Sequence, residues 1–425
     1  MKMNKFIPAG LLALALAPLT ALATPTVIHV TAGTAFRPAV EAAIINILNS
    51  PTAAFVGASL PKATSAVIAG TLKNGPSAGQ GVVFEILWAG SNAGVAAAAQ
   101  QSPVVTDVFP TATNSSSSVS LVGSAGSYTF SGATSLSSGS VITENAQPDV
   151  VPSITFQAST IFFGTGYNTL NDAIVGVAPL VWVRGNAATS DGTTTSSNSS
   201  FASITNITTQ QANNLLAGGL PLSQFTNNPA DQGTAIEAIG RDEDSGQRIV
   251  AFDEVGYGSQ STPQQYQPTV GTGSLSTVIT AINLWPANPS PIDGVVYNIA
   301  GHSGYNSATT QAADLSRKVA PGLGTFLISY FSLSDAANVT TGAQLSYNGV
   351  AESTAAVQQG TYTFWAYEHI LSRAALTGVA SDAVTALSTQ ILNTDAAQGG
   401  VLLNDPNFVV GRTVEGGQVT FGNPY

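Results

Sequence analysis

The chain has 425 residues, of which 8% are charged, and 23 acidic residues against 12 lysines and arginines give a formal net charge of −11. Nucleic acids and anionic membranes both require a positive surface on their partners, so neither is an expected ligand. The chain contains no cysteine, and its three histidines (His29, His302 and His369) lack the spacing of a zinc site. We therefore expect no metal site and no cofactor.

The first 23 residues contain the three parts of a secretory signal. Lys2 and Lys5 precede an apolar run that ends at Ala21-Leu22-Ala23, which fits the small-x-small cleavage rule. The alternative, a membrane anchor, fits less well because the run is short and has no stop-transfer flank. We predict cleavage near Ala23 and a mature protein that is periplasmic or extracellular.

Strand and helix patterns alternate along the mature chain. Residues 27–30 fit a short buried strand, and apolar residues recur at helical spacing over 36–48. The same order follows with a strand at 82–88, a turn at 90–92 and an alanine-rich helix from Ala93. This alternation predicts an α/β protein with two lobes, each a mixed sheet flanked by helices.

The stretch 103–147 interrupts this order, because it is rich in Ser, Thr and Gly with short alternating segments. It predicts a self-contained, β-rich insertion at the surface. A long apolar run from Ala173 predicts a central strand that crosses between the lobes. Further on, Thr208 and Gln211 form a capping box for a helix that ends at Gly218-Gly219.

Three turns that contain Gly or Ser lie between a strand and a helix, at 33–36, 90–94 and 245–247. The first N–H groups of a helix have no acceptor inside it and carry the positive end of the helix dipole, so they attract anions. One such turn alone is typical of an ordinary helix cap. Three of them together with Arg241 indicate a site for a tetrahedral oxyanion.

Arg241 lies in IGRDEDSGQR (239–248), where two arginines and three acids fill ten positions of a chain that otherwise has little charge. The plain alternative is a solvated turn. The preferred interpretation is that Arg241 is paired by neighbouring acids when the site is empty and contacts the anion when it is occupied.

The segment LLAGGLPLSQFTNNPADQGTAIEAIGRDEDSGQ (215–247) resembles the matching part of the periplasmic phosphate-binding proteins of ABC transporters. In that family a helix, a loop and a strand lead to Arg-x-x-x-Ser-Gly-Thr. The turns at 33–36 and 90–91 resemble the family's two anion loops. GTFLISYFSLSDA and GTYTFWAYEHI are similar to its return strand and its aromatic C-terminal helix start. The resemblance runs along most of the mature chain outside 103–147.

The resemblance implies a type II periplasmic binding protein fold and capture of phosphate, or a similar oxyanion, between two lobes that close on a hinge. It implies no catalysis, and a membrane permease as the partner. Lobe I would comprise 24–178 and 337–425, and lobe II 179–336, with crossings near Ala178 and Ala336. The resemblance implies a set of ligand-binding residues: Thr34, Ala35, Phe36, Ser91, Arg241, Ser245, Gly246 and Gln247.

The roles implied for these residues are those of hydrogen-bond donors to the anion. The planar fork of Arg241 would bind two oxygens. Hydroxyls would come from Ser245, Ser91 and Thr34. Backbone N–H groups would come from three residues: Phe36, Gly246 and Gln247.

Two positions depart from the family pattern. Gln247 replaces the last Thr of the motif. In PDVVPSIT (148–155), Ile154 occupies the place of the carboxylate that accepts the proton of phosphate. Glu243 or Asp244 would have to compensate. The missing carboxylate, the insertion and the scarcity of lysine favour an alternative, a surface, matrix or sensor protein of the same fold with a degenerate anion site.

A hydrolase is a weaker alternative. GHSGY (301–305) is similar to the Gly-x-Ser-x-Gly elbow, but Tyr305 stands where the strained turn requires a small residue. We expect a helix start capped by Ser303 or Ser307 instead. His29, inside an apolar strand, is expected to be a buried histidine with a hydrogen-bond partner.

Overall fold

The computed structural model describes residues 24–101, 106–259, 261–285, 291–292, 295–296 and 303–422. The predicted signal at 1–23 lies outside these ranges, as do Gly301 and His302 of the GHSGY segment. Within them, no helix is long and apolar enough to cross a membrane.

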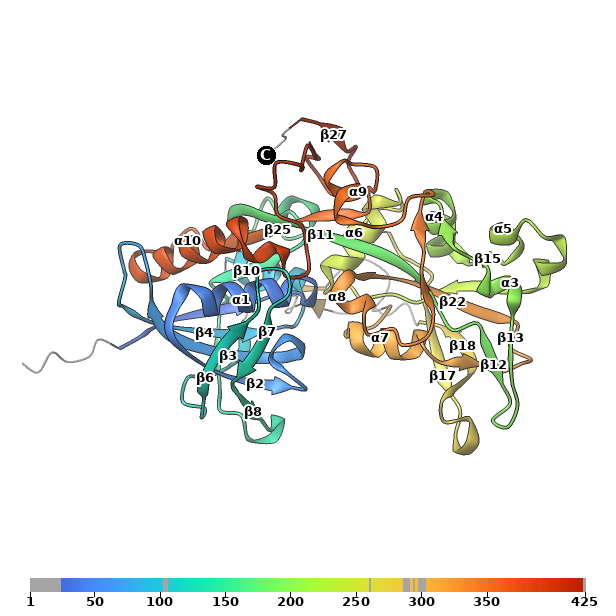
Figure 1. Ribbon diagram of the computed structural model, residues 1–425, viewed down its shortest axis with the longest axis horizontal. Coiled ribbons are helices and arrows are strands. Elements are labelled where there is room, and N and C mark those ends of the chain that lie inside the picture. Colours follow the sequence, from blue (N-terminus) through green and yellow to red (C-terminus); the bar gives the residue numbers. More distant parts are fainter. Residues whose placement is uncertain are drawn as a thin grey trace, which may run out of the picture.

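One mixed sheet of 14 strands extends through both halves of the molecule (Figure 1). Two of its strands lie off the main path: β8 (Thr134–Leu136) pairs with β2, and β23 (Ala343–Gln344) pairs with β11. The order along the path is β15 (Leu220–Pro221), β16 (Ala235–Ala238), β22 (Thr325–Ser332), β11 (Asn171–Arg184), β25 (Trp365–Ser372), β10 (Val150–Ser153), β1 (Thr26–Thr31), β4 (Gly81–Leu87), β3 (Ala63–Leu72), β2 (Leu48–Gly57), β6 (Ser117–Val122) and β7 (Thr129–Gly132).

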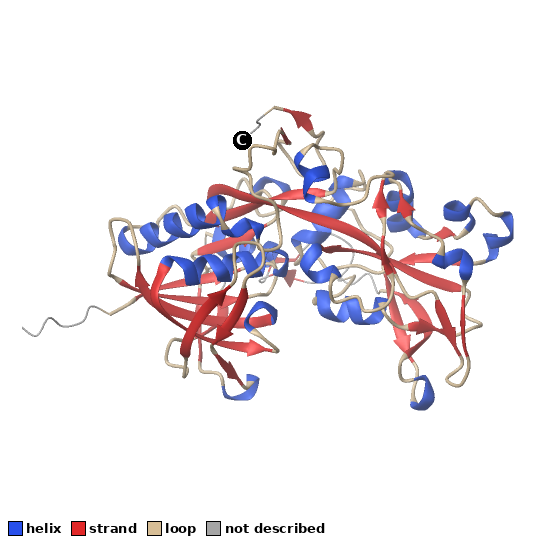
Figure 2. Ribbon diagram, viewed as in Figure 1, coloured by secondary structure: helices blue, strands red, loops and turns tan. Residues whose placement is uncertain are grey.

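Helices lie against this sheet in both halves (Figure 2). Thr208 and Gln211 form the predicted capping box at the start of α4, and its last residue is Gly218. The helices are α1 (Arg37–Ile47), α2 (Ser91–Ala99), α3 (Ser199–Ala202), α4 (Thr209–Gly218), α5 (Ser223–Thr226), α6 (Gly246–Glu254), α7 (Ala308–Leu315), α8 (Leu333–Ala336), α9 (Thr354–Gln358) and α10 (Gly378–Asn393).

Smaller sheets complete the fold. A five-stranded sheet has the order β13 (Thr195–Ser197), β12 (Ala188–Ser190), β21 (Lys318–Val319), β18 (Val278–Leu284) and β17 (Tyr266–Val270). The two-stranded sheets are β5 (Asp107–Pro110) with β9 (Thr143–Ala146), β14 (Asn206–Ile207) with β24 (Ser346–Tyr347), β19 (Pro291–Ile292) with β20 (Val295–Val296), and β26 (Val410–Gly411) with β27 (Thr420–Phe421).

Two large hydrophobic cores divide the molecule into halves. In the first half, which contains β1, α1, β4 and α10, Ile28, Ile44 and Phe84 are fully buried. In the second half, which contains β16, β22, α6 and α7, Trp182 and Tyr330 are fully buried. The predicted two-lobed α/β architecture is therefore confirmed, because each core has its own part of the sheet and its own helices.

Strand β11 joins the halves and is the predicted central strand that crosses between them. Its residues 171–179 pair with β25, and its residues 180–184 pair with β22. Figure 1 shows it running from one half into the other as a single long arrow. The two halves therefore share a continuous backbone hydrogen-bond network, in addition to side-chain contacts.

The two strand–turn–helix units near the N-terminus are confirmed. β1 and β4 are parallel neighbours in register, and each leads into a turn and then a helix. α1 follows a 3-10 helix, Thr34–Phe36, and α2 begins at Ser91, two residues earlier than predicted. Because parallel strands end at the same edge of the sheet, both helices start on the same side of the first half.

The insertion at 103–147 is β-rich as predicted, but the prediction that it is self-contained is wrong. β6 and β8 both pair with β2 of the main sheet. Phe109 is fully buried, and Val119 belongs to the core of the first half. The alternating pattern of β6 correctly indicates one polar, exposed face. Its other face packs on the core of the first half, and the strand extends the main sheet beyond β2.

The predicted lobe boundaries near 178 and 336 stay a prediction, with one observation against the second. The predicted boundary puts the stretch 337–364 in lobe I, yet β23 pairs with β11 and β24 with β14. Tyr347, Tyr362 and Phe364 belong to the core of the second half. Their rings are buried there, so this part of the predicted lobe I packs against the second half.

Candidate functional site

The three predicted helix starts meet at one cavity. The 3-10 helix Thr34–Phe36 and the start of α2 come from the first half, and the start of α6 comes from the second. All eight predicted ligand residues are in its wall. The lining residues are Gly33, Thr34, Ala35, Phe36, Trp88, Ala89, Gly90, Ser91, Pro152, Ser153, Ile154, Arg241, Ser245, Gly246, Gln247 and Asn306.

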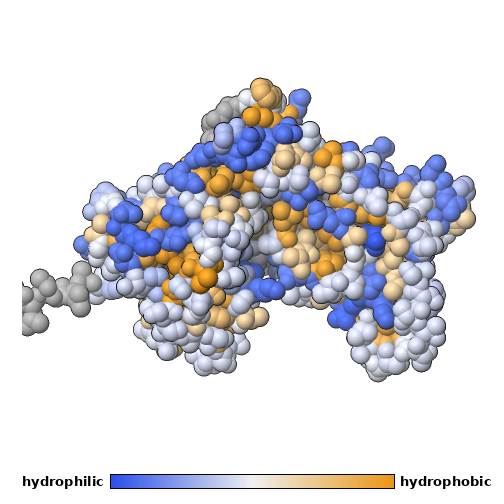
Figure 3. All heavy atoms as spheres, viewed as in Figure 1, coloured by the Kyte–Doolittle hydropathy of each residue, from blue (hydrophilic) through white to orange (hydrophobic). Residues whose placement is uncertain are grey.

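The cavity is small. Its free volume is about 20 Å³ for the centre of a water-sized sphere, and one buried water needs roughly 10–15 Å³ by this measure. Pockets for drug-sized organic ligands measure roughly 300–1,000 Å³. The cavity therefore has room for one compact ion or one or two waters. Figure 3 shows that the surface is hollowed between the two halves.

Arg241 is buried in the wall of this cavity, and backbone carbonyls hold it. Its side chain is 4% exposed, Nε donates to the carbonyl of Tyr305 at 3.0 Å, and Nη2 donates to the carbonyl of Asn306 at 3.1 Å. Asp242 and Glu243 are also buried, so the alternative of a solvated turn is wrong.

The predicted pairing of Arg241 with its neighbouring acids is not found in the described part of the chain. Glu243 lies 3.9 Å from Arg248 instead, and both side chains are buried. Arg248 also donates to the carbonyl of Ser303 at 2.8 Å. Glu243 is thus an ion-pair partner of Arg248, whereas backbone carbonyls fix the guanidinium of Arg241 without neutralising its charge.

Ser91 presents a buried hydroxyl group to the cavity. It is 1% exposed, and its Oγ has no hydrogen-bond partner among the described residues. Glycines leave the space around it: a Cβ on Gly246 would lie 2.4 Å from this oxygen, and one on Gly33 would lie 3.3 Å away. A buried hydroxyl without a partner costs roughly 1–3 kcal/mol, and a hydrogen-bond acceptor in the cavity would offset this cost.

The start of α6 adds backbone donors to the same wall. Ser245 is the N-cap residue, and its side chain makes no capping hydrogen bond. Gly246 and Gln247 are the first two residues of the helix, where N–H groups have no acceptor within it. This helix end therefore combines free amides, the positive end of a dipole and an uncommitted hydroxyl.

Asp335 organises the site from behind the cavity wall, and no prediction included it. Its Oδ2 accepts from Thr34 Oγ1 at 3.1 Å, Gln247 Nε2 at 2.6 Å and Ser332 Oγ at 3.0 Å. The hydroxyl of Thr34 is therefore committed to Asp335 and is not free for an anion. The capping pattern Ser332-x-x-Asp335 at α8 was the available sequence signal.

The loop that carries Arg241 (residues 239–245, called the arginine loop) also contacts the start of α2 directly. The backbone N–H of Asn92 donates to the carbonyl of Asp244 at 3.1 Å, and its side chain donates to the carbonyl of Glu243 at 2.8 Å. Gly90 has a φ of 128°, and a Cβ there would lie 2.5 Å from the Asp244 oxygen. Glycine is required for this approach, which closes one half onto the other.

The cavity wall, as far as the structure describes it, contains no carboxylate. Ile154 lines the cavity, at the place where the sequence pattern lacks the expected acid. The suggested compensation by Glu243 or Asp244 is wrong, because neither residue lines it. Their backbone carbonyls accept hydrogen bonds from Asn92.

The described residues of the GHSGY segment, 303–305, contact the arginine loop. Tyr305 is buried, bridges to Arg241 along the backbone and donates its hydroxyl to Asp314 at 2.8 Å. The helix that follows is capped by Ser307, one of the two predicted residues. Tyr305 thus has a packing role at the position where a nucleophile elbow would require a small residue.

Fold and cavity together define the class: a two-lobed α/β protein with a small, partly open, donor-rich cavity between its halves. No family model and no curated protein matches the sequence. Among solved structures, similar ones are phosphate-binding proteins of ABC transporters.

One similar structure is a Clostridium perfringens protein described as a phosphate ABC transporter substrate-binding protein, with bound phosphate. It is 12% identical, with coverage of 89% of this chain and 100% of that chain and a TM-score of 0.43. An ABC-type phosphate transport receptor of Vibrio cholerae is 11% identical over 60% of this chain and 80% of its own, with a TM-score of 0.35. PstS of Borrelia burgdorferi is 12% identical, with coverage of 86% of this chain and 92% of its own and a TM-score of 0.34.

Proposed function

We propose that the cavity binds one tetrahedral oxyanion, with phosphate as the first candidate, and that the protein is an exported solute-binding protein. The observation that carries this proposal is the unpartnered, buried hydroxyl of Ser91, which lines a cavity of ionic size together with Arg241 and the start of α6. Each of these groups donates hydrogen bonds, which an oxyanion accepts from several directions at once.

The roles of the residues follow from their positions. Arg241 supplies the positive charge, and the carbonyls of Tyr305 and Asn306 fix its orientation. Ser91 and Ser245 supply hydroxyls, and Gly246 and Gln247 supply backbone N–H groups. Thr34, Ala35 and Phe36 also line the cavity, and Thr34 acts by positioning through Asp335.

The ligand would be held and released unchanged. Histidine and carboxylate side chains, which usually provide general acid and base groups, do not line the cavity in the described part of the chain. Delivery to a membrane permease of an ABC transporter is the natural use of an exported protein of this type. The apolar N-terminal run and the cleavage rule at Ala23 support export.

A second candidate function is a surface, matrix or sensor protein in which the anion site is degenerate. Ile154 in the cavity wall favours it, because an apolar side chain there offers nothing to a protonated oxygen. The two functions predict different results in solution. A transport receptor requires tight, reversible binding, whereas a degenerate site requires none.

Isothermal titration calorimetry of the mature chain, residues 24–425, with phosphate, sulfate and arsenate tests the proposal. We expect saturable binding of one anion per chain for at least one of the three. Chloride at the same ionic strength is the control for screening. If none of the three oxyanions binds, the transport function is wrong and the second candidate takes its place.

A further inference from the structure

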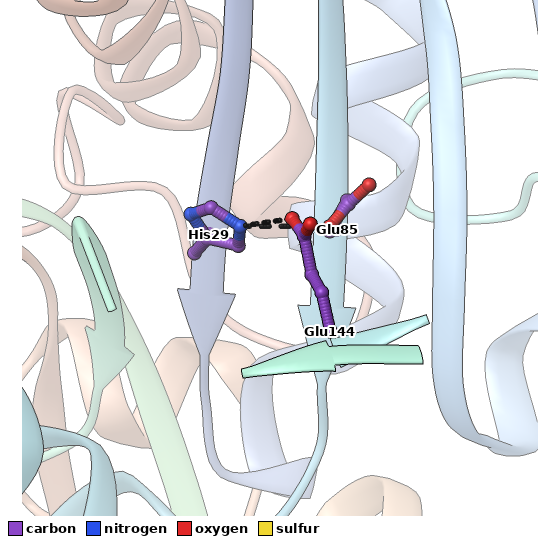
Figure 4. Close-up of side chains that lie close together, drawn as sticks. All are labelled: His29, Glu85 and Glu144. Carbon is purple, nitrogen blue, oxygen red and sulfur yellow. Dashed lines mark hydrogen bonds and ion pairs between the residues drawn. The ribbon is translucent and has the colours of Figure 1, made fainter. Parts of the chain in front are cut away.

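A second polar cluster lies in the first half, apart from the cavity, and shares no residue with it. Three strands contribute to it: His29 on β1, Glu85 on β4 and Glu144 on β9 (Figure 4). His29 and Glu85 are direct partners in the parallel register of β1 and β4. One ligand atom from each of the three side chains lies within 4.8 Å of the others.

The separations between these atoms match those around a small metal ion. His29 Nε2 lies 2.9 Å from Glu144 Oε1 and 3.5 Å from Glu85 Oε2. Zinc bonds nitrogen and carboxylate oxygen at about 2.0–2.1 Å, so adjacent ligands in a tetrahedron lie roughly 3.3 Å apart. Both separations are close to this value, and all three atoms lie within 4.8 Å of one another, so a single small ion can contact all three.

Glu85 is the second, independent sign of a ligand. Its side chain is 2% exposed, and its Oε2 accepts no hydrogen bond among the described residues. Its other oxygen, Oε1, accepts from the backbone N–H of Ala112 at 2.9 Å. One oxygen is thus fixed by the chain, and the other is buried, accepts no hydrogen bond and lies 3.5 Å from His29 Nε2.

The outer groups are those of a metal-binding histidine. Asp149 Oδ2 lies 3.4 Å from His29 Nδ1 and accepts from the His29 backbone N–H at 3.1 Å. A carboxylate at Nδ1 fixes the ring and directs the lone pair of Nε2 at the metal. Asp149 is in turn 3.3 Å from Arg373, which balances its charge.

The electrostatics of the cluster favour a cation. With Asp149 paired to Arg373, two carboxylates face one imidazole. A proton on the ring balances one of these charges, whereas a dication on a neutral ring balances both.

We propose that His29, Glu85 and Glu144 bind one divalent transition-metal cation, of which Zn²⁺ is the probe. Imidazole with carboxylates suits zinc and its neighbours better than calcium or magnesium, which prefer oxygen alone. Glu144 is 47% exposed, so the ion enters from that side. The ion ties β9, in the insertion, to β1 and β4 of the main sheet.

Calorimetric titration of the chelator-treated mature chain with ZnCl₂, in buffer free of phosphate, tests this site. We expect one Zn²⁺ per chain, and at least tenfold weaker binding for Glu144→Gln and for Glu85→Gln. Zinc raises the unfolding temperature of the wild type and not of these variants. Glu144 is half exposed, so Glu144→Gln keeps the fold even if Glu85→Gln does not.

The matched control is Asp172→Asn. Asp172 pairs with His369 at 2.8 Å, a histidine–carboxylate contact in the same half of the molecule that is not part of a three-ligand group. The affinity of the Asp172→Asn variant for zinc should equal that of the wild type. Absence of saturable zinc binding, or unchanged affinity in Glu144→Gln, would overturn the site without affecting the proposed anion cavity.

Discussion

Ser91 and Gly246 begin two helices from opposite halves of the chain, and a Cβ atom on Gly246 would lie 2.4 Å from the Ser91 hydroxyl. Gly246 has an ordinary helical backbone, without a positive φ, so its conformation does not require glycine. Glycine is needed here because a side chain would fill the space next to the Ser91 hydroxyl. This space is the part of the cavity that the proposed anion occupies.

Gly246→Ala should therefore abolish anion binding or weaken it at least tenfold. The added methyl group meets Ser91 at 2.4 Å and Ile154 at 3.1 Å, so it either fills the cavity or forces the two halves apart. Calorimetry with the best of the three oxyanions measures the effect. Gly233→Ala is the control, because a Cβ there meets no atom within 4 Å. Equal affinities of both variants would place the ligand elsewhere.

Arg241→Lys should weaken anion binding about ten- to hundredfold, although it keeps the positive charge. Lysine has one nitrogen, so it cannot contact the carbonyls of Tyr305 and Asn306 and the anion together. A lost charge-assisted hydrogen bond costs roughly 1.5–3 kcal/mol. Calorimetry compares it with Arg317→Lys, which alters a partly exposed ion pair with Asp314. An affinity equal to that of the wild type would remove Arg241 from the site.

Features that depend on neighbouring residues were predictable from the sequence. The turns at 33–36, 90–94 and 245–247 carry local signals, namely glycine or serine between an apolar strand and a helix, and the structure has a helix start at each. The meeting of the three turns was suggested by a family resemblance. Local pattern alone does not bring residues 34, 91 and 245 together.

Features that depend on strand pairing could not be predicted from the sequence. His29, Glu85 and Glu144 are separated by more than fifty positions each, and only the register of β1 with β4 and the placement of β9 unite them. Asp335 was missed for the same reason. Its capping signal is local, but its contacts with Thr34 and Gln247 arise from the packing of the two halves.

Asp335→Asn should lower the free energy of unfolding by roughly 1–3 kcal/mol, because its Oδ2 accepts three buried or partly buried hydrogen bonds that an amide cannot accept equally. Urea unfolding followed by circular dichroism measures the loss. Asp382→Asn is the control, since that carboxylate accepts one bond, from Ser77, at a partly buried site. Similar losses in the two variants would show that Asp335 does not hold the halves together.

Glu237 gives the fold a predictable dependence on pH. Burial raises the pKa of Glu237 from 4.5 to about 7, against the opposing effect of a hydrogen bond from Tyr266. The folded state thus holds the proton more tightly than the unfolded state, so stability falls as the pH rises from 4.5 through 7. Glu237→Gln cannot ionise and should be more stable than the wild type at pH 8 by a larger margin than at pH 5.

Urea unfolding of both proteins at pH 5 and pH 8 measures this margin. If the difference in unfolding free energy between Glu237→Gln and the wild type is the same at pH 5 and pH 8, Glu237 has the same pKa in the folded and unfolded chains.

Phe109→Ala should destabilise the protein by roughly 3–5 kcal/mol, the usual cost of removing a fully buried aromatic ring. Phe109 belongs to the insertion, and its ring centroid lies 5.0 Å from that of His29 on β1. Thermal and urea unfolding, with a chelator present to exclude any effect of zinc, measure the loss. Val122→Ala, at a position 56% exposed in the same insertion, should cost less than about 0.5 kcal/mol. If Phe109→Ala costs as little as Val122→Ala, the insertion contributes nothing to the core, and its removal would leave the lobes folded.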